Sequence, residues 1–233
     1  MSDQATILTR IREALKTPAP ERHLHGHGTA HSPQKEPSGF QAWLPLVGCS
    51  WEEQFSLFRK NSEMLKTELV TYTDQADLQT KLQEQAIRDN WKKIGTHRGQ
   101  WSGPVIEDLH LPQVVTDSSY STRGIETCDV GITECDALVA QTGSVLVTTA
   151  SAGGRVLSVL PPHHVVLARP DQLVPDLDAA FKKLSQLYAK NWPSFISFIT
   201  GPSRTGDIER ILVLGAHGPK RLTVYCGLKP GSG

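Results

Sequence analysis

The sequence has no net charge, no long apolar run and few cysteines, and each shortage excludes a class of protein. Its 233 residues carry 24 Lys and Arg against 24 Asp and Glu, so no overall field attracts nucleic acid or anionic lipid. No uninterrupted apolar stretch approaches the roughly 18–20 residues needed to cross a bilayer. The first residues, MSDQATILTRIREALK, carry charges throughout and lack the apolar core of an export signal. We therefore expect a cytoplasmic globular protein with no membrane span and no nucleic-acid partner.

The four cysteines are too scattered to form a metal or iron–sulfur site of their own. They are Cys49, Cys128, Cys135 and Cys226, and the closest pair is separated by six residues, with no C-x-x-C in the chain. Structural zinc sites and self-contained iron–sulfur clusters need closely spaced ligands. Dispersed thiols in a chain of this length are typical of small buried hydrophobic residues. We expect neither a disulfide framework nor a cofactor bound by this chain.

The first 39 residues differ in composition from the rest. Residues 1–16 predict an amphipathic helical arm, because apolar side chains recur there at helical spacing. Residues 17–39 contain four Pro, three Gly and four His, and too few apolar side chains to offset the entropy of ordering, so we expect a disordered linker. Its histidines suggest metal binding, but nothing nearby would form a rigid second shell, and no metal site is predicted. One α/β domain is expected to span residues 40–233.

Residues 40–233 alternate strand-like and helix-like segments. Apolar residues from Trp51 to Leu69 follow one helical stripe, and Asp74 is positioned to cap a second helix that ends near Trp91. Near-continuous apolar runs, typical of strands buried on both faces, follow as DALVA, SVLVTT, HHVVLA, SFISFIT and RLTVYC. Short strands are expected at 69–72 and near Ile94, and further helices at 154–160, 177–190 and 207–214. This order predicts an α/β fold, a three-layer sandwich around a mainly parallel sheet with some antiparallel strands.

The segment SFITGPSRTGDIE, residues 197–209, has the pattern of a strand, a small-residue loop and a helix. Gly201 lets the backbone approach a ligand, while Ser203, Arg204 and Thr205 could offer an anion backbone amides, hydroxyls and a guanidinium. Open α/β sheets bind ligands beyond the carboxyl ends of their strands, where this loop is expected to lie. The alternative is structural: a hydroxyl caps the helix, and Arg204 pairs with an acid of its first turn. Both interpretations stay open.

Other polar residues of the second half are candidates for the same cleft. The segment Gln141-Thr142-Gly143-Ser144 is expected to turn between antiparallel strands, with hydroxyls available to a ligand. His217 lies in a glycine-flanked turn, and His163 and His164 begin a strand, where one of the two should point inward because neighbours alternate faces. Asp136 is the nearby acid, equally explained as a turn or strand-end residue. The candidate ligand-binding residues are Thr142, Gly143, Ser144, Gly201, Ser203, Arg204, Thr205 and His217, followed by Asp136, Gln141, His163 and His164.

Three segments of the second half occur in an order and spacing that match a known family. They are VGITECDALVAQTGSVLV, GRVLSVLPPHHVVLA and GPSRTGDIERILVLGAHGP, between about Val130 and Gly227. Together they resemble the LUD-domain family, in particular its lactate-utilisation proteins. The resemblance implies the fold of sugar-phosphate isomerases and CoA-transferases, known as NagB/RpiA/CoA-transferase-like. Relatives often carry an acidic residue where this chain has Gln141, which cannot act as a nucleophile or a general base.

The resemblance also implies a function. It implies an accessory subunit that acts with iron–sulfur partner proteins in the oxidation of L-lactate to pyruvate, with the clusters held by those partners. A function from a different class is a small-molecule enzyme or sensor that binds a phosphorylated or carboxylated metabolite at the loop 201–207. No spacing resembles a nucleophile elbow, so serine hydrolysis is not predicted. Whether the chain is an enzyme stays open.

Overall fold

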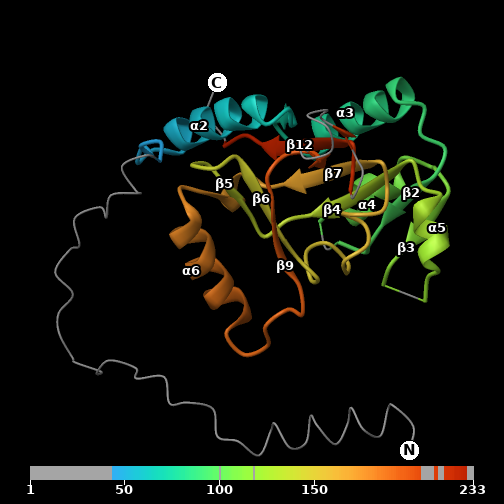
Figure 1. Ribbon diagram of the computed structural model, residues 1–233. Coiled ribbons are helices and arrows are strands. Elements are labelled where there is room, and N and C mark those ends of the chain that lie inside the picture. The colour runs from blue at the N-terminus through green and yellow to red at the C-terminus, as the bar shows by residue number, and fades with distance from the viewer. Residues whose placement is uncertain (1–43, 100, 118, 206–212, 215–217, 230–233) are drawn as a thin grey trace, which may run out of the picture. The chain divides into compact units, whose positions relative to one another are not determined.

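The computed structural model of the chain describes residues 44–99, 101–117, 119–205, 213–214 and 218–229 (Figure 1). The chain divides into two units, Met1–Ala42 and Trp43–Gly233, and all of these residues belong to the second. The helical arm predicted at 1–16 and the linker predicted at 17–39 lie outside the described residues, and both stay predictions. Within the described ranges, no helix has the length and apolar character needed to span a membrane.

A six-stranded sheet forms the centre of this unit, and all of its strands are parallel. Its strand β7 has the sequence HHVVLA, and all six residues are buried. A strand covered on both faces needs such a run, which explains why the polar–apolar alternation of a half-exposed strand is missing from it. In spatial order the strands are β1 (Glu68–Tyr72), β12 (Arg221–Gly227), β7 (His163–Ala168), β4 (Val130–Glu134), β2 (Ile94–Thr96) and β3 (Gln113–Val115).

Helices α3 (Gln75–Arg88) and α4 (Gly103–Glu107) cover one face of this sheet. Leu78 of α3 and Ile106 of α4 pack in one buried cluster with Val165 of β7. Helix α2 (Trp51–Met64) covers the other face, where its aromatic side chains pack in a second cluster with Val166. Since Val165 and Val166 are neighbours on one strand, their side chains point to opposite faces, and the two clusters are separate layers of the core.

A second sheet of four strands packs beside α2 on the same face, and it is mixed. Strands β5 and β6 are antiparallel, as are β6 and β9, whereas β8 runs parallel to β5. Helix α6 lies on its outer face, where Leu184 packs with Val139 and Leu146 (Figure 1). The predicted α/β sandwich, with a mainly parallel sheet and some antiparallel strands, is confirmed. The elements are β8 (Leu173–Val174), β5 (Ala137–Val139), β6 (Ser144–Thr148), β9 (Ile196–Ile199) and α6 (Leu177–Tyr188).

Short polar residues begin the long helices, as their chemistry predicts. Ser50, Asp74 and Asp176 each accept a hydrogen bond from the backbone amide three residues on, at 3.1, 2.9 and 2.8 Å, which satisfies an amide that the first turn would leave unpaired. The turn predicted at 141–144 joins β5 to β6, and Gly143 in it has a φ of +66°, a left-handed conformation that glycine adopts without strain. The predicted cap at Asp74 and the antiparallel pair of strands are therefore confirmed.

The helix predicted at 154–160 is wrong, because this segment forms turns and bends. Gly153 and Gly154 have φ values of +57° and +113°, which a right-handed helix cannot contain. Leu157 is nevertheless fully buried, and a side chain on Gly131 of β4 would overlap its carbonyl. The apolar residues of this segment therefore belong to a loop that packs closely on the sheet.

The helix predicted at 207–214 is wrong at its end. Val213–Leu214 form β11, which pairs antiparallel with β10 (Arg204–Thr205), and residues 207–212 lie outside the described residues. The pattern also did not predict the short elements, whose apolar runs are too brief or are interrupted by glycine and threonine, as in VGITE of β4. Besides β10 and β11, the elements that were not predicted are β3, β4, β8, α4, α5 (Thr122–Glu126) and the 3-10 turn η2 (Pro170–Gln172).

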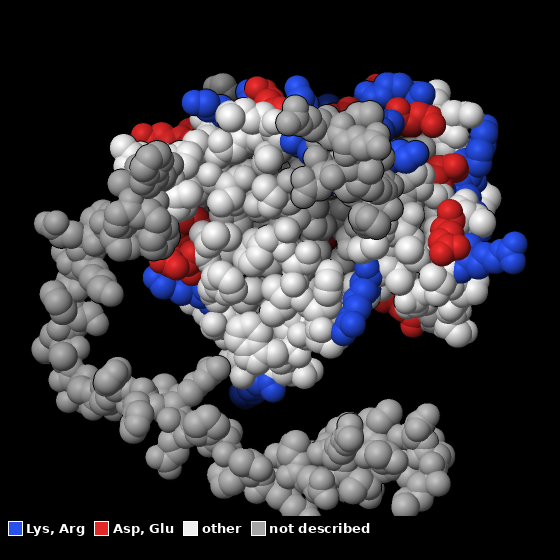
Figure 2. All heavy atoms as spheres, in the orientation of Figure 1, with Lys and Arg blue, Asp and Glu red and all other residues white. Residues whose placement is uncertain are grey.

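Charged side chains of both signs are mixed around the edge of the face in Figure 2, and its middle is largely uncharged. No broad patch of a single sign appears on the coloured part of this face. On this face the arrangement agrees with the balanced composition of the chain.

Candidate functional site

The carboxyl ends of β2, β4 and β7 open onto one pocket, which we call the carboxyl-end crevice. Its volume is about 470 Å³, and it is closed on one side by α6 and by the turn that follows β6. Parallel strands bring their carboxyl ends to the same edge of a sheet, and open α/β sheets bind ligands there. The polar side chains that line the crevice are His97, Arg98, Asp117, Glu134, Asp136, Ser151, Arg169, Asp171, Gln172, Lys183 and Tyr188.

Asp136 lines the crevice and is held in place by two hydroxyl groups. The Tyr188 hydroxyl donates to Oδ1 of Asp136 at 2.6 Å, and the Ser151 hydroxyl donates to Oδ2 at 2.6 Å. Asp136 is only 6% exposed, and burial together with the bond to Asp136 raises the pKa of Tyr188 to about 12. Tyr188 therefore stays protonated and donates. Each carboxylate oxygen keeps capacity to accept one more hydrogen bond.

Lys183 lines the same crevice one and a half turns before Tyr188 on α6. Its ammonium donates to the backbone carbonyl of Asp171 at 3.1 Å. Burial lowers the pKa of Lys183, while the negative charges of Asp171 and Asp136 oppose the shift. Among the described residues, no carboxylate lies within ion-pair distance of this ammonium. The crevice thus contains a cation whose remaining donors are available to a ligand.

Two arginines add positive charge at the ends of strands. Arg169 follows β7 directly, and its Nε lies 3.1 Å from Oδ1 of Asp171, so its charge is partly neutralised. Arg98 follows β2 by two residues, and its side chain is exposed. Its backbone amide donates to Asp117 at 2.5 Å. Arg98 and Arg169 therefore add exposed positive charge to a crevice whose lining also includes the exposed carboxylates of Asp117 and Asp171.

His97 and Glu134 form the wall of the crevice nearest α4. Oε1 of Glu134 accepts from the backbone amide of Ser102 at 3.1 Å and from its hydroxyl at 2.7 Å. The backbone amide of Glu134 donates to Nε2 of His97 at 3.3 Å, which places the ring proton on Nδ1. Burial lowers the pKa of His97, although Glu134 and Asp117 oppose the shift. His97 is therefore a neutral ring whose other nitrogen can donate.

Several residues predicted as ligand contacts come together elsewhere, around the end of α2. Gly143 and Gly201 both have positive φ values, and both lie against Leu65 just after α2. The Arg204 guanidinium donates to the carbonyl of Leu65, and the Ser144 and Thr200 hydroxyls are 2.8 Å apart. Because Leu65 precedes β1, this group lies at the amino end of the main sheet, away from the carboxyl-end crevice.

The remaining predicted residues of that loop and turn have separate positions. The backbone amide of Ser203 donates to the carbonyl of Pro219 at 2.9 Å. The side-chain amide of Gln141 donates to the carbonyl of Pro45 at 3.1 Å, and the Thr142 hydroxyl is buried with no hydrogen-bond partner in the described part of the chain. Thr205 ends β10, and its side chain lies outside the described residues, as does His217. Their roles as ligand contacts stay predictions.

The two adjacent histidines point to opposite faces of the main sheet, as the alternation of a strand requires. Both are buried, because both faces are covered. Nε2 of His164 lies 2.9 Å from the Thr133 hydroxyl, and Nε2 of His163 lies 2.8 Å from the Thr223 hydroxyl. Burial lowers the pKa of His163 to about 4, with Arg221 contributing, and that of His164 to about 3. Both are neutral core residues at neutral pH.

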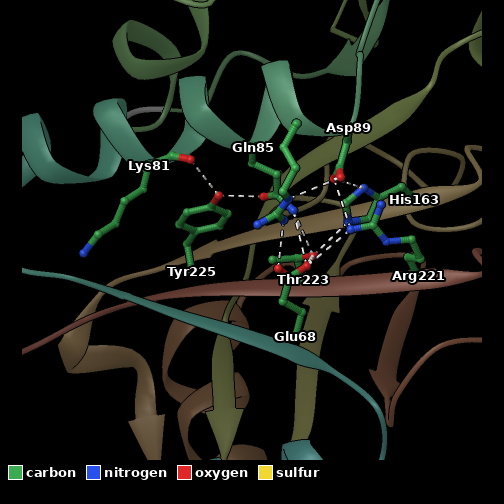
Figure 3. Close-up of polar contacts among 9 residues, drawn as sticks. Glu68, Lys81, Gln85, Asp89, His163, Arg221, Thr223 and Tyr225 are labelled. Carbon is green, nitrogen blue, oxygen red and sulfur yellow. Dashed lines mark hydrogen bonds and ion pairs between the residues drawn. The ribbon is translucent and has the colours of Figure 1, made fainter.

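His163 belongs to a polar network at the amino end of the sheet (Figure 3), and no labelled member of this network lines the carboxyl-end crevice. Arg221 pairs with Asp89 at 3.0 Å and with Glu68 at 3.4 Å, and the Thr223 hydroxyl donates to Glu68 at 2.8 Å. Burial alone would raise the pKa of Glu68, but the Thr223 hydrogen bond and the nearby arginines lower it overall. These contacts join β1, β7 and β12 to the end of α3, while Nδ1 of His163 is buried with no hydrogen-bond partner in the described part of the chain.

Among the sequence-predicted residues whose side chains the structure describes, Asp136 alone lines the crevice. Arg98 and Arg169 could have been found, because each lies within two residues of the end of a predicted strand. No sequence pattern near Ser151, Lys183 or Tyr188 marks them as site residues, because only the packing of the second sheet brings them to the main sheet. Throughout the described ranges, no group of three or more His, Cys, Asp or Glu is placed to hold a metal ion.

The described residues define an α/β sandwich with a polar crevice at the carboxyl edge of its parallel sheet. The LUD domain family model matches residues 56–226, and the chain belongs to this family. The match extends well beyond the three segments that carry the resemblance in the sequence. A crystal structure of a DUF162 family protein from Deinococcus radiodurans superposes with a TM-score of 0.61 at 18% identity, covering 79% of this chain and 100% of that chain, which supports the fold.

Curated relatives that share one name are similar to this chain over most of its length. The chain is 28% identical over 240 residues to "Lactate utilization protein C" of Bacillus subtilis (strain 168), covering 94% of this chain and 93% of the relative. It is 38% identical over 164 residues to the protein of the same name from Halalkalibacterium halodurans, covering 64% and 71%. The protein of that name from Anoxybacillus flavithermus is 30% identical over 193 residues, covering 76% and 81%.

Proposed function

We propose that the chain is an accessory component of L-lactate utilisation that acts with iron–sulfur partner proteins in the oxidation of lactate to pyruvate. The observation that carries the proposal is the end-to-end similarity to the Bacillus subtilis relative, which covers 94% of this chain. Relatives from several other bacteria bear the same name, which supports a shared role. The proposal places this work in the cytoplasm.

The state of the cysteines supports the assignment of the redox clusters to partners. Cluster ligands are thiolates, and Cys128, Cys135 and Cys226 are all buried. Burial raises the pKa of Cys226 to about 12 and raises that of Cys135 well above its usual value. These two thiols are buried in one core cluster and stay protonated. The electrons that leave lactate are therefore assigned in this proposal to clusters of other chains.

A genetic experiment tests the requirement for the chain. Its gene is deleted, and growth is measured with L-lactate and, in parallel, with pyruvate as the sole carbon source. The proposal predicts loss of growth on L-lactate alone, restored by the intact gene, because pyruvate enters metabolism after the oxidation step. Normal growth of the deletion strain on L-lactate would overturn it.

A biochemical experiment tests the partnership. The tagged full-length chain is purified from cells grown on L-lactate, and the captured proteins are identified and analysed for iron and acid-labile sulfide. The expected result is co-purification of iron–sulfur proteins, and oxidation of L-lactate by those partners only when this chain is present. Full activity of the partners without the chain would contradict the proposal.

A further inference from the structure

The carboxyl-end crevice contains both halves of a recognition site for a small hydroxy acid. A carboxylate ligand needs a cation with free donors, and its hydroxyl group needs a fixed acceptor. Lys183 and Asp136 line the same crevice of about 470 Å³, one with unused donors and the other with unused acceptor capacity. The apolar side chains of Ala150 and Leu187 line it beside them.

We propose that the carboxyl-end crevice binds a 2-hydroxycarboxylic acid. Lys183 donates hydrogen bonds to the carboxylate of this ligand, and Asp136 accepts a hydrogen bond from its hydroxyl group. The choice of L-lactate as that acid rests on the proposed function, whereas the class of ligand rests on the two side chains. The methyl group of lactate would contact Ala150 or Leu187. No bond is made or broken in this step, which is binding alone.

The fixed position of Asp136 explains why the ligand should carry a hydroxyl group. Tyr188 and Ser151 hold its two oxygens at 2.6 Å each, so the carboxylate cannot turn away from a ligand. It is an acceptor only. In pyruvate, a ketone oxygen takes the place of the hydroxyl group and would face the negative charge of Asp136. In propionate, a hydrogen atom takes that place and would leave the carboxylate without a donor. A site built to hydrogen-bond a hydroxyl discriminates strongly against an analogue that lacks it.

The position of Lys183 explains why the ligand should be an anion. Its ammonium contacts only a backbone carbonyl within the described residues, and burial makes an unpaired charge unfavourable there. A bound carboxylate would neutralise it. The neighbouring Lys182 is exposed and does not line the crevice. It is therefore a matched control for charge on the same helix.

Calorimetric titration of the full-length chain tests the proposal with four ligands: L-lactate, pyruvate, propionate and inorganic phosphate. Since the crevice is roomier than lactate, we expect a Kd on the order of 1 mM. Lactate should bind at least about tenfold more tightly than propionate or pyruvate. Lys183→Gln should raise the Kd for lactate by roughly tenfold or more, and Lys182→Gln should leave it unchanged. Asp136→Asn should remove the preference for lactate over propionate.

A measurement on the unaltered chain covers the case in which Asp136→Asn fails to fold. Backbone amide resonances of Ala150, Lys183 and Tyr188 should shift as L-lactate is added, and they should shift less with propionate. Absence of lactate binding, equal binding of phosphate and lactate, or identical affinities in the Lys183→Gln and unaltered chains would overturn the inference.

The two proposals fail in different ways. If deletion of the gene abolishes growth on L-lactate but the purified chain does not bind lactate, the crevice assignment is wrong and the proposed function stands. If the chain binds lactate through Lys183 but the partners oxidise lactate fully without it, the proposed function is wrong and the site stands.

Discussion

The Tyr188 hydroxyl donates a 2.6 Å hydrogen bond to Asp136, across 52 residues of sequence. Asp136 lies between the last strand residue of β4 and the first of β5, where the chain passes from the main sheet to the second sheet. Tyr188 is the last residue of α6, on the outer face of the second sheet. This bond therefore joins the layers at the crevice, and it orients the carboxylate that we assign to ligand binding.

Replacement of Tyr188 by phenylalanine removes that donor and leaves the ring. Because Asp136 is nearly buried, loss of a hydrogen bond to its carboxylate should lower the free energy of unfolding by about 1–3 kcal/mol. Urea unfolding of the Tyr188→Phe chain measures this change. Tyr120→Phe, at a 39% exposed tyrosine, is the control and should change stability by less than about 0.5 kcal/mol. Equal effects of the two substitutions would contradict the role given to the Tyr188 hydroxyl.

The buried histidines predict a loss of stability in mild acid. His164 has a pKa of about 3 in the folded chain because burial disfavours its charge, whereas an exposed histidine titrates near 6.5. Between those values the unfolded chain binds more protons, so the free energy of unfolding is highest above pH 6.5. It falls as the pH drops below that value, by up to about 1.4 kcal/mol per pH unit for this residue. Thermal unfolding followed from pH 7.5 to 4.5 measures the slope.

Two substitutions test whether His164 causes this pH dependence of the free energy of unfolding. His164→Gln keeps a polar group able to reach Thr133 but removes the titration, so the slope should become shallower and the contribution of His163 should remain. His110→Asn changes an exposed histidine whose φ is +50°, a conformation that asparagine tolerates, and the slope should not change. An unaltered slope in His164→Gln would show that other groups cause the acid sensitivity.

Gly143 is predicted to resist substitution. Its φ of +66° disfavours any side chain, and a Cβ there would lie 2.9 Å from Cβ of Asn61. Gly143→Ala should therefore cost about 1–3 kcal/mol in the free energy of unfolding. Gly103→Ala is the matched control, because no atom lies within 4 Å of a Cβ at that helical position, and alanine should stabilise it by up to about 1 kcal/mol. The reverse order of stability would contradict the described turn.

Thiol labelling tests the burial of the cysteines on which the proposed function depends. Cys49 is exposed, whereas Cys128, Cys135 and Cys226 are buried, so a disulfide reagent should react with one thiol quickly and with the other three only after unfolding. A Cys49→Ser chain should lose the fast reaction. Several fast-reacting thiols in the native chain would remove the argument that its cysteines cannot serve as cluster ligands.

The layers of the fold could be predicted from sequence because burial on two faces leaves a visible pattern. The run HHVVLA predicted the central strand β7, and Asp74 marked the start of α3. Where glycine governs the backbone, as at Gly153 and Gly154, apolar residues suggested a helix that does not form. The spacing of apolar residues indicates that they are buried. It does not distinguish a helix from a closely packed loop, because both bury such residues.

The candidate site was harder to predict because it is assembled from several layers. The rule that ligands bind at the carboxyl ends of parallel strands was applied to the segment after β9, but β9 belongs to the mixed second sheet. Arg169, directly after β7, satisfies the rule in the correct sheet. Lys183 and Tyr188 could not be assigned in this way, since only the packing of α6 against the second sheet brings them to Asp136.

The most direct test of the account is a crystal structure of the full-length chain soaked with L-lactate. We predict electron density for one lactate molecule in the carboxyl-end crevice, with its carboxylate on Nζ of Lys183 and its hydroxyl on the carboxylate of Asp136. A crevice that stays empty at saturating lactate, or lactate bound instead beside Arg204 and the 142–144 turn, would contradict it.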